Sequence, residues 1–271
     1  MKFSVLMSIY YKEKPEHFDR AMKSIWDEQT VKPNEIVLVQ DGKLTEELYE
    51  VINKWQDKLG DVFKTIPLEK NVGLGDALNI GIDKCSYELV ARMDTDDVAL
   101  PHRFAKQLEV LKNKNIDICG SWVSEFDGDE SQIISYRKLP ENHNEIVGFA
   151  KKRNPINHPA VMYKKSSVLK AGGYKYMLWF EDYYLWVRMI LNGAKFYNIQ
   201  EPLVKMRAGY GQLTRRRGFK YAKAEYDFLK ELKKIGFLNS FEFYTNVFIR
   251  VPTRLLPKSF VKHIYHFIRK K

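Results

Sequence analysis

The sequence predicts an α/β fold in which a mostly parallel sheet is flanked by helices and followed by a basic helical C-terminal segment. Short runs of aliphatic and β-branched residues alternate with longer runs of helical periodicity from residue 3 to residue 113. Such alternation favours parallel strands joined by helices that cover both faces of the sheet. A chain of 271 residues, 45% of them hydrophobic, is long enough for one sizeable domain with an appendage.

The net charge of +11 is concentrated at one end of the chain. Residues 205–271 contain 17 Lys and Arg against 4 Asp and Glu, whereas the remainder contains 28 against 30. The basic end therefore needs an explanation of its own, separate from the near-neutral body.

Each expected element follows from a local pattern. Strands are expected where apolar runs are short and bounded by turn residues, at 3–9, 35–39, 62–67 and 88–93. Helices are expected where apolar residues recur at helical spacing, at 15–28, 44–59 with Thr45 as N-cap, 75–84, and 101–113 with Pro101 at its start. Beyond residue 116 the pattern loosens, with strands at 118–126, 132–137, 160–163, 195–199 and 203–206, helices at 141–151 and 181–192, and a helical, basic stretch from Arg215 onward.

The sequence shows no membrane span, disulfide framework or cysteine metal cluster. No segment reaches the roughly 18 uncharged apolar residues that span a bilayer. The first residues look at first like a signal peptide, but they lack a small-residue cleavage site and are expected to form a buried strand. Cys85 and Cys119 are interpreted as ordinary buried thiols, and the cytoplasm is the expected compartment.

An acidic cluster, formed by Asp94, Asp96 and Asp97, follows the fourth expected strand. In an open α/β sheet, ligands bind outside the carboxyl ends of the strands. Clustered carboxylates repel one another unless a cation or donors compensate them, and their oxygens suit Mg²⁺ or Mn²⁺ bound together with substrate phosphates. Two alternatives remain open. One is a solvated turn that caps the next helix, and the other is the nucleophile loop of a haloacid-dehalogenase-like phosphatase, which that class places after its first strand.

Five segments occur in the order and spacing of a known family. They are 4–10 (SVLMSIY), 36–42 (IVLVQDG), 71–79 (NVGLGDALN), 91–97 (ARMDTDD) and 179–185 (WFEDYYL). With these segments the chain resembles a family 2 glycosyltransferase of the GT-A fold over residues 3–210, and within that family it resembles the amylovoran and O-antigen branch. The resemblance implies a catalytic domain at 1–210, with a nucleotide-binding half at 1–115 and an acceptor half at 116–210, before a basic amphipathic segment at 211–271.

The resemblance also implies that a UDP-sugar binds at the carboxyl ends of the first strands. Ser8 and Tyr10 would line the nucleotide pocket, and Asp41 would accept the N3–H of uracil, with a cap on the Gly42 turn as its alternative role. The ribose, diphosphate and donor sugar would lie near Asn71, Gly73, Asp76, Asn79, Arg92, Asp94 and His158. The alternatives are a simple helix entry for the glycine loop, a surface cation for Arg92 and a structural imidazole for His158.

Two further acidic groups would carry the chemistry. Asp96, together with Asp94, would position Mn²⁺ or Mg²⁺, which neutralises the leaving nucleoside diphosphate. Asp182 would be the general base that deprotonates the acceptor hydroxyl, and Glu181 would hold the acceptor or orient the site. The alternative for the pair Glu181–Asp182 is a favourable first-turn position at a helix N-terminus.

The basic segment resembles an interfacial amphipathic helix that is attracted to anionic lipid. An apolar stripe would be flanked there by Arg250 and Arg254. A solvated or packed face and a nucleic-acid patch are the alternatives, but no recognition motif accompanies the charge, and no nucleic-acid partner is expected. The stripe would consist of Phe241, Tyr244, Val247, Phe248, Val251, Leu255 and Leu256.

The predicted function is that of an inverting, metal-dependent glycosyltransferase. It would move a sugar, galactose as the first expectation, from a UDP-sugar to an undecaprenyl-diphosphate-linked acceptor in surface polysaccharide or O-antigen biosynthesis. The enzyme is expected to be cytoplasmic and peripheral on the inner face of a bacterial cell membrane. A non-catalytic nucleotide- or glycan-binding protein is the alternative, and the presence of both Asp96 and Asp182 argues against it.

Overall fold

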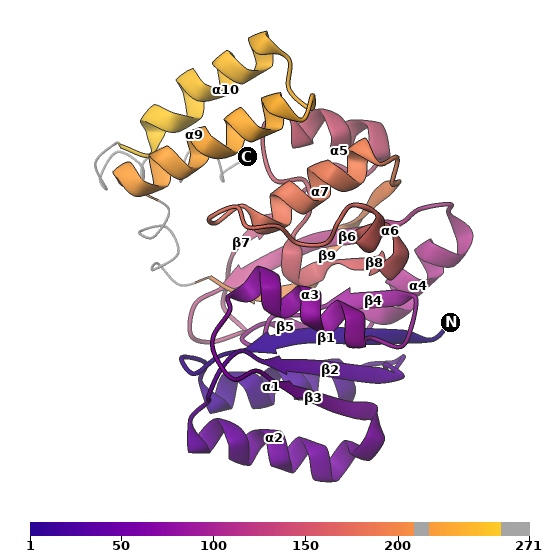
Figure 1. Ribbon diagram of the computed structural model, residues 1–271. Helices are drawn as coiled ribbons and strands as arrows, with labels where there is room; N and C mark the ends of the chain where they lie inside the picture. Colours follow the sequence, from indigo (N-terminus) through magenta and orange to yellow (C-terminus); the bar gives the residue numbers. More distant parts are fainter. Residues whose placement is uncertain (209–216, 256–271) are drawn as a thin grey trace.

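A single sheet forms the centre of the protein (Figure 1). The computed structural model describes residues 1–208 and 217–255, and within them nine strands pair in the order β3-β2-β1-β4-β8-β6-β9-β5, with β7 paired to β6. The strands are β1 Phe3–Ile9, β2 Glu35–Gln40, β3 Phe63–Pro67, β4 Leu89–Arg92, β5 Val98–Ala99, β6 Ile118–Phe126, β7 Ile133–Arg137, β8 Met162–Lys164 and β9 Phe196–Arg207.

The first four strands in this order form the predicted parallel sheet. β1 pairs in parallel with β2 and β4, and β2 pairs in parallel with β3. The sheet then becomes mixed, because β8 runs antiparallel to both β4 and β6, whereas β6 and β9 are parallel. The carboxyl ends of β1, β2 and β4 meet at one edge, which is where an open α/β sheet binds its ligands.

Helices flank this sheet, as predicted. They are α1 Pro15–Trp26, α2 Glu46–Leu59, α3 Leu74–Lys84, α4 Arg103–Asn113, α5 His143–Ala150, α6 Lys165–Lys170, α7 Glu181–Leu191, α9 Phe219–Lys234 and α10 Ser240–Thr253. Thr45 caps α2 as expected, since its side chain accepts a hydrogen bond from the N–H of Leu48. His102 occupies the N-cap position of α4, so Asp97 does not cap that helix. Within residues 1–208 and 217–255, every helix is too short or too polar to cross a membrane.

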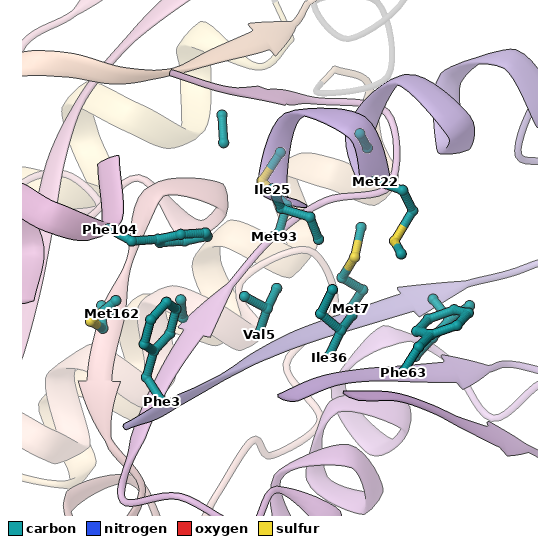
Figure 2. Close-up of a cluster of buried hydrophobic side chains, with 14 of the residues drawn as sticks. Phe3, Val5, Met7, Met22, Ile25, Ile36, Phe63, Met93, Phe104 and Met162 are labelled. Atoms are coloured by element: carbon teal, nitrogen blue, oxygen red, sulfur yellow. The ribbon is translucent and has the colours of Figure 1, made fainter. Parts of the chain in front are cut away.

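Both faces of the sheet are buried. Side chains alternate along a strand, so Phe3, Val5 and Met7 of β1 pack on one face against α1, α2 and α4 (Figure 2). Leu6 points to the other face and packs with α3 and α7. Gly81 lets α3 approach the sheet closely, because a Cβ at that position would lie 2.4 Å from Cδ1 of Leu6. Burial on both faces explains why the strands are continuous apolar runs.

The C-terminal helices extend the fold beyond α7. Phe228 of α9 stacks on Phe180, with 4.7 Å between the ring centroids and 5° between the ring planes. α10 packs back on α9, where Arg250 and Arg254 both form ion pairs with the buried carboxylate of Glu225. In Figure 1 these two helices lie at the end of the molecule opposite α2.

Several short elements differ from the expected ones. The strands expected at 195–199 and 203–206 are one strand, β9, because the chain around Pro202 stays paired with β6 through an irregular register. The sequence did not predict β5 or α6, since two and six residues are too few to show a period.

The expected lipid-facing stripe divides into two faces. Val247 and Val251 pack inward against the cluster formed with α7 and α9. Arg250 and Arg254 were expected to flank the stripe as lipid-facing cations, but both are engaged with Glu225. The predictions for Arg215, Leu256 and the rest of the C-terminal end lie outside the described residues.

Candidate active site

Asp41, directly after β2, holds the loop that leads into α3. Its Oδ1 accepts a hydrogen bond from the backbone N–H of Val72 at 2.7 Å. Its Oδ2 accepts from the backbone N–H of Gly73 at 3.1 Å and from Nδ2 of Asn71 at 2.9 Å. The carboxylate therefore caps the loop at 71–73 and not the Gly42 turn. Oδ1 retains one acceptor position.

The other residues expected to bind the nucleotide lie along the same edge. Tyr10 is exposed directly after β1, where the N–H of Asp41 donates to the carbonyl oxygen of Ile9 at 2.7 Å. Ser8 is half-buried near the end of β1, and Asp76 is exposed in the first turn of α3. The structure thus brings the predicted donor-side residues to the carboxyl ends of β1 and β2.

Asn79 has a partner that the sequence did not reveal. Its Nδ2 donates to the carbonyl oxygen of Tyr174 at 2.8 Å, and its Oδ1 accepts from the N–H of Tyr174 at 2.7 Å. Gly173 has a φ of +62°, and a Cβ there would lie 2.5 Å from Oδ1 of Asn79, so only glycine fits. Arg188 of α7 donates to the carbonyl oxygen of Gly173 at 2.6 Å. The Asn79 amide therefore anchors the turn that positions Tyr174.

The carboxylates of Asp94, Asp96 and Asp97 lie together just beyond β4, and each offers an oxygen within 4.8 Å of the others. Burial, together with the charges of Asp94 and Glu13, raises the pKa of Asp96 to about 7. Burial and the two neighbouring carboxylates raise the pKa of Asp97 well above its usual range. Oδ1 of Asp97 accepts from the N–H of Arg207 at 2.8 Å, whereas its Oδ2 is buried without a hydrogen-bond partner.

Two buried arginines lie beneath the acidic cluster. Arg92 is 2% exposed and forms an ion pair with Asp94, so it is not a surface cation. Arg103 donates from Nη2 to the carbonyl oxygen of Arg92 at 2.6 Å. Burial and the charge of Arg92 lower the pKa of Arg103 to about 9. These guanidinium groups offset only part of the negative charge.

The acidic cluster fits a divalent cation. It offers hard oxygen ligands, one of which has no partner, and Mg²⁺ and Mn²⁺ favour such ligands. Burial and the repulsion between the carboxylates raise the pKa values of Asp96 and Asp97, and a bound cation would compensate their negative charge. A solvated turn would not bury carboxylates in this way.

His158 and Tyr174 lie between the acidic cluster and α7. Nε2 of His158 is 2.8 Å from the hydroxyl of Tyr174. Burial and the charge of Arg92 lower the pKa of His158 well below its usual value, so the imidazole is neutral at pH 7. Burial raises the pKa of Tyr174, the positive charge of Arg92 opposes this, and the negative charges of Asp182 and Asp94 add to it. The pKa of the Tyr174 hydroxyl therefore responds to a carboxylate from each acidic group of the site.

Glu181 and Asp182 occupy the first turn of α7, and both are half-buried. Nδ2 of Asn154 donates to Oδ2 of Asp182 at 2.7 Å, and the N–H of Tyr183 donates to its Oδ1 at 2.7 Å. Burial raises the pKa of Glu181, and the charge of Asp182 adds to this. A Cβ placed on Gly75 would lie 3.7 Å from Cγ of Glu181. The first turn of α3 and the start of α7 therefore lie close together.

Trp179 is a feature that the sequence could not reveal. Its backbone φ is +66°, a left-handed conformation that costs a bulky residue about 1 kcal/mol or more. The side chain is exposed, and its ring stacks on Tyr221 with 4.9 Å between centroids. Strained residues gather at functional sites. Trp179 is such a residue, two positions before Glu181.

Comparison with known proteins gives sequence matches over nearly the whole chain. The model of glycosyl transferase family 2 matches residues 4–169. An amylovoran biosynthesis glycosyltransferase from Erwinia amylovora is 40% identical over 272 residues, which cover 99% of each chain. A UDP-Gal:alpha-D-GlcNAc-diphosphoundecaprenol beta-1,3-galactosyltransferase from Escherichia coli is 40% identical over 265 residues, covering 97% of this chain and 95% of its own.

A solved structure shows the same fold at much lower identity. A mannosyltransferase from Pyrobaculum calidifontis, in complex with GDP-Man and Mn²⁺, matches with a TM-score of 0.67 and 13% identity, covering 94% of this chain and 72% of that chain. This match confirms the expected GT-A fold. None of these matches supports the phosphatase alternative for the acidic cluster.

Proposed function

The chain belongs to glycosyl transferase family 2, and on that premise we propose that it transfers a sugar, galactose in the first instance, from a UDP-sugar to a sugar carried on undecaprenyl diphosphate. The observation that carries the proposal is the presence of two acidic groups at the site, the Asp94–Asp97 cluster directly after β4 and the Glu181–Asp182 pair in the first turn of α7, beside Gly75 of α3. The cluster would hold a cation that binds the leaving diphosphate, and the Glu181–Asp182 pair would accept the proton of the reacting hydroxyl. The names of the two relatives support a role in surface polysaccharide or O-antigen biosynthesis.

The nucleotide of the donor would lie along the edge between Asp41 and Asp94. These residues follow β2 and β4, which β1 separates, so roughly 10 Å is available between them. The remaining acceptor position on Oδ1 of Asp41 would take the N3–H of uracil. Ser8 and Tyr10 would line the base, and the exposed side of the loop would flank the ribose and diphosphate. Asn71 and Gly73 belong to this loop, and Asp76 and Asn79 follow on α3.

The diphosphate would lie over the acidic cluster and its buried cations. Asp96 and Asp94 would hold Mn²⁺ or Mg²⁺, which supplies positive charge to the departing diphosphate. The buried side chain of Arg92 forms an ion pair with Asp94, and this ion pair would orient the Asp94 carboxylate toward the metal. The neutral imidazole of His158, whose Nε2 is paired with the hydroxyl of Tyr174, would donate a hydrogen bond from Nδ1–H to the diphosphate.

Asp182 would act as the general base. An inverting transfer needs a carboxylate on the face of the donor sugar opposite the leaving group, where the acceptor hydroxyl attacks C1 and gives up its proton. Asn154 orients Asp182 through Oδ2. Glu181, whose pKa is raised by burial, would bind an acceptor hydroxyl beside it. The product of this attack on an α-linked donor is a β-glycoside.

The chain would act where its acceptor is anchored, on the inner face of the cell membrane. Residues 1–115 would bind the nucleotide, residues 116–210 the acceptor, and the segment from residue 211 would contact the anionic membrane. The excess of basic residues after Lys205 supports this last assignment.

A panel of nucleotide sugars with Mn²⁺ tests the proposal. The release of UDP is followed for each donor, with and without a lipid-diphosphate-linked acceptor. Acceptor-dependent release from one UDP-sugar, with UDP-galactose first, is the expected result. Release that ignores the acceptor for every donor, or turnover of GDP-sugars alone, would contradict it.

A further inference from the structure

The outward face of α10 carries large apolar side chains from its first turn to its end. Large hydrophobic side chains recur there at helical spacing, and each of them is more than half exposed. Phe241 is 80% exposed and Phe248 is 76% exposed. We call this surface the α10 outer face, and it consists of Phe241, Tyr244, Phe248, Ile249 and the following Leu255.

The α10 outer face is not a loosely packed part of the core. The opposite side of α10 already packs inward, since Phe243 is buried and Val247 lies against the cluster formed with α7 and α9. Ion pairs from Arg250 and Arg254 to the buried Glu225 fix the rotation of the helix. The orientation that exposes Phe241 and Phe248 is therefore held by buried contacts.

We infer that the α10 outer face is a membrane-docking surface, which inserts its side chains into the interfacial layer of an anionic bilayer. The inference rests on the proposed function, in which the acceptor is anchored in lipid. An interfacial helix buries its apolar face roughly 5–10 Å into the boundary between headgroups and acyl chains. The aromatic rings of this face suit that layer.

Charge favours a bilayer over a second copy of the chain. Residues 205–271 contain 17 basic residues against 4 acidic ones, so an anionic surface attracts this part of the protein. Lys233 lies at the edge of the α10 outer face, with Nζ 5.2 Å from the ring centroid of Tyr244. Two copies joined through this face would bring two strongly basic segments together, which like-charge repulsion opposes.

Packing transmits the position of α10 to the acceptor side of the site. Glu225 ties α10 to α9, and the stack of Phe228 on Phe180 ties α9 to the start of α7. Glu181 and Asp182 follow Phe180 directly. In Figure 1, α9 and α7 lie in turn between α10 and the sheet, so docking through α10 would hold the acceptor half next to the bilayer.

Vesicle binding tests the inference without any need for catalysis. The full chain is sedimented with phosphatidylglycerol-containing vesicles that hold no acceptor. The variant Phe241→Asp/Phe248→Asp is compared with Ile134→Asp/Tyr136→Asp, which removes two exposed hydrophobic residues of β7 and changes the charge equally. We expect the first variant to lose at least tenfold in vesicle partitioning and the second to stay within twofold of the wild type. Equal partitioning of the two variants would overturn the inference.

A site-specific probe keeps the inference testable if the double variant does not fold. Cys85 and Cys119 are buried and burial raises the pKa of each thiol to about 12, so a new exposed cysteine is labelled selectively. An environment-sensitive dye on Phe248→Cys should shift to the blue with vesicles, and the same dye on Ile134→Cys should not. Unchanged emission from the dye at residue 248 while the protein is bound to vesicles would overturn the inference. So would a dimer in the absence of lipid, if Phe248→Asp dissociated the dimer and left vesicle binding intact.

These outcomes are separable from the proposed function. Transfer to a water-soluble acceptor analogue measures catalysis without a membrane, and we expect Phe241→Asp/Phe248→Asp to retain it. Loss of vesicle binding with retained transfer supports docking through α10. A wild-type chain that binds vesicles but never transfers would refute the proposed function and leave the docking surface standing.

Discussion

Asn154 donates a hydrogen bond from Nδ2 to Oδ2 of Asp182 at 2.7 Å. An amide donor orients a carboxylate without accepting its proton, because the amide nitrogen is not basic. Asn154 therefore suits a residue that positions a general base. The bond also joins the loop before β8 to the first turn of α7, two segments that lie 28 positions apart in the chain.

Replacing the proposed base should separate catalysis from binding. Asp182→Asn removes the proton acceptor but little volume, so kcat should fall by about 10²–10⁴ while the Kd for the UDP-sugar stays near the wild-type value. Glu181→Gln should chiefly raise KM for the acceptor. Steady-state kinetics and calorimetry measure the two effects. A larger loss of kcat in Glu181→Gln than in Asp182→Asn would exchange the two roles.

Replacing Asp96 should increase the stability of the metal-free protein and abolish its activity. In the metal-free protein the pKa of Asp96 is raised to about 7, above the value near 4 of the unfolded chain, so stability is lost as the pH rises through this interval. Asp96→Asn should therefore increase the free energy of unfolding at pH 8 by about 2–4 kcal/mol in chelator. The same change should abolish Mn²⁺-dependent transfer.

Denaturant unfolding in chelator and transfer assays in Mn²⁺ give the two readouts. Asp57→Ala, an exposed carboxylate on α2, serves as the control and should change neither. A folded Asp96→Ala protein with full activity in excess chelator would rule out the metal role.

The strained backbone of Trp179 should make its replacement nearly neutral for stability. Trp179→Gly relieves the left-handed conformation but loses the stack on Tyr221, two terms of about 1 kcal/mol each with opposite sign. The exposed ring beside Glu181 is expected to contact the acceptor, so KM for the acceptor should rise about 3- to 10-fold. Tyr176→Gly removes an exposed ring from the same segment and serves as the control. Equal KM values in the two variants would exclude Trp179 from the acceptor site.

Glu35 should make the parallel sheet sensitive to acid. Burial opposes ionisation of this carboxylate, but hydrogen bonds from Lys64, Ser4 and Ser86 outweigh it and lower the pKa to about 2. Because the folded pKa lies below the unfolded one, the stabilisation is present above about pH 4.5 and is lost as the pH falls toward 2. Glu35→Gln should cost about 2–3 kcal/mol at pH 7, and roughly 2 kcal/mol of this difference should vanish between about pH 5.5 and pH 3. Urea unfolding across this range would show a constant difference if the ion pair were unimportant.

The strands and helices of the first half were predictable because their causes are local. The bounds of β1 match the expected strand at 3–9, and Thr45 caps α2 as its position before an acidic first turn suggested. The acidic cluster was also predictable, since a strand that ends at Arg92 places the following carboxylates at the edge of the sheet. Periodicity and position carry this information without any tertiary contact.

The partners of these residues were not predictable, because they come from distant segments. Asn79 and Tyr174 are 95 positions apart, and their paired hydrogen bonds depend on the approach of α3 to α7. In the same way, the spacing of Arg250 in the sequence predicted a lipid-facing cation, whereas in the structure Arg250 forms an ion pair with the buried Glu225. Sequence patterns give the face on which a residue lies, whereas the identity of its partner depends on how the helices pack.

The anomeric configuration of the product shows whether the acceptor hydroxyl displaces UDP directly. The wild-type chain, Mn²⁺, UDP-galactose and a lipid-diphosphate-linked acceptor are allowed to react, and the new glycoside is examined by NMR. If Asp182 activates the acceptor hydroxyl opposite the departing UDP, the product is a β-glycoside with a large coupling between H1 and H2. An α-glycoside with a small coupling would contradict direct displacement with Asp182 as the base.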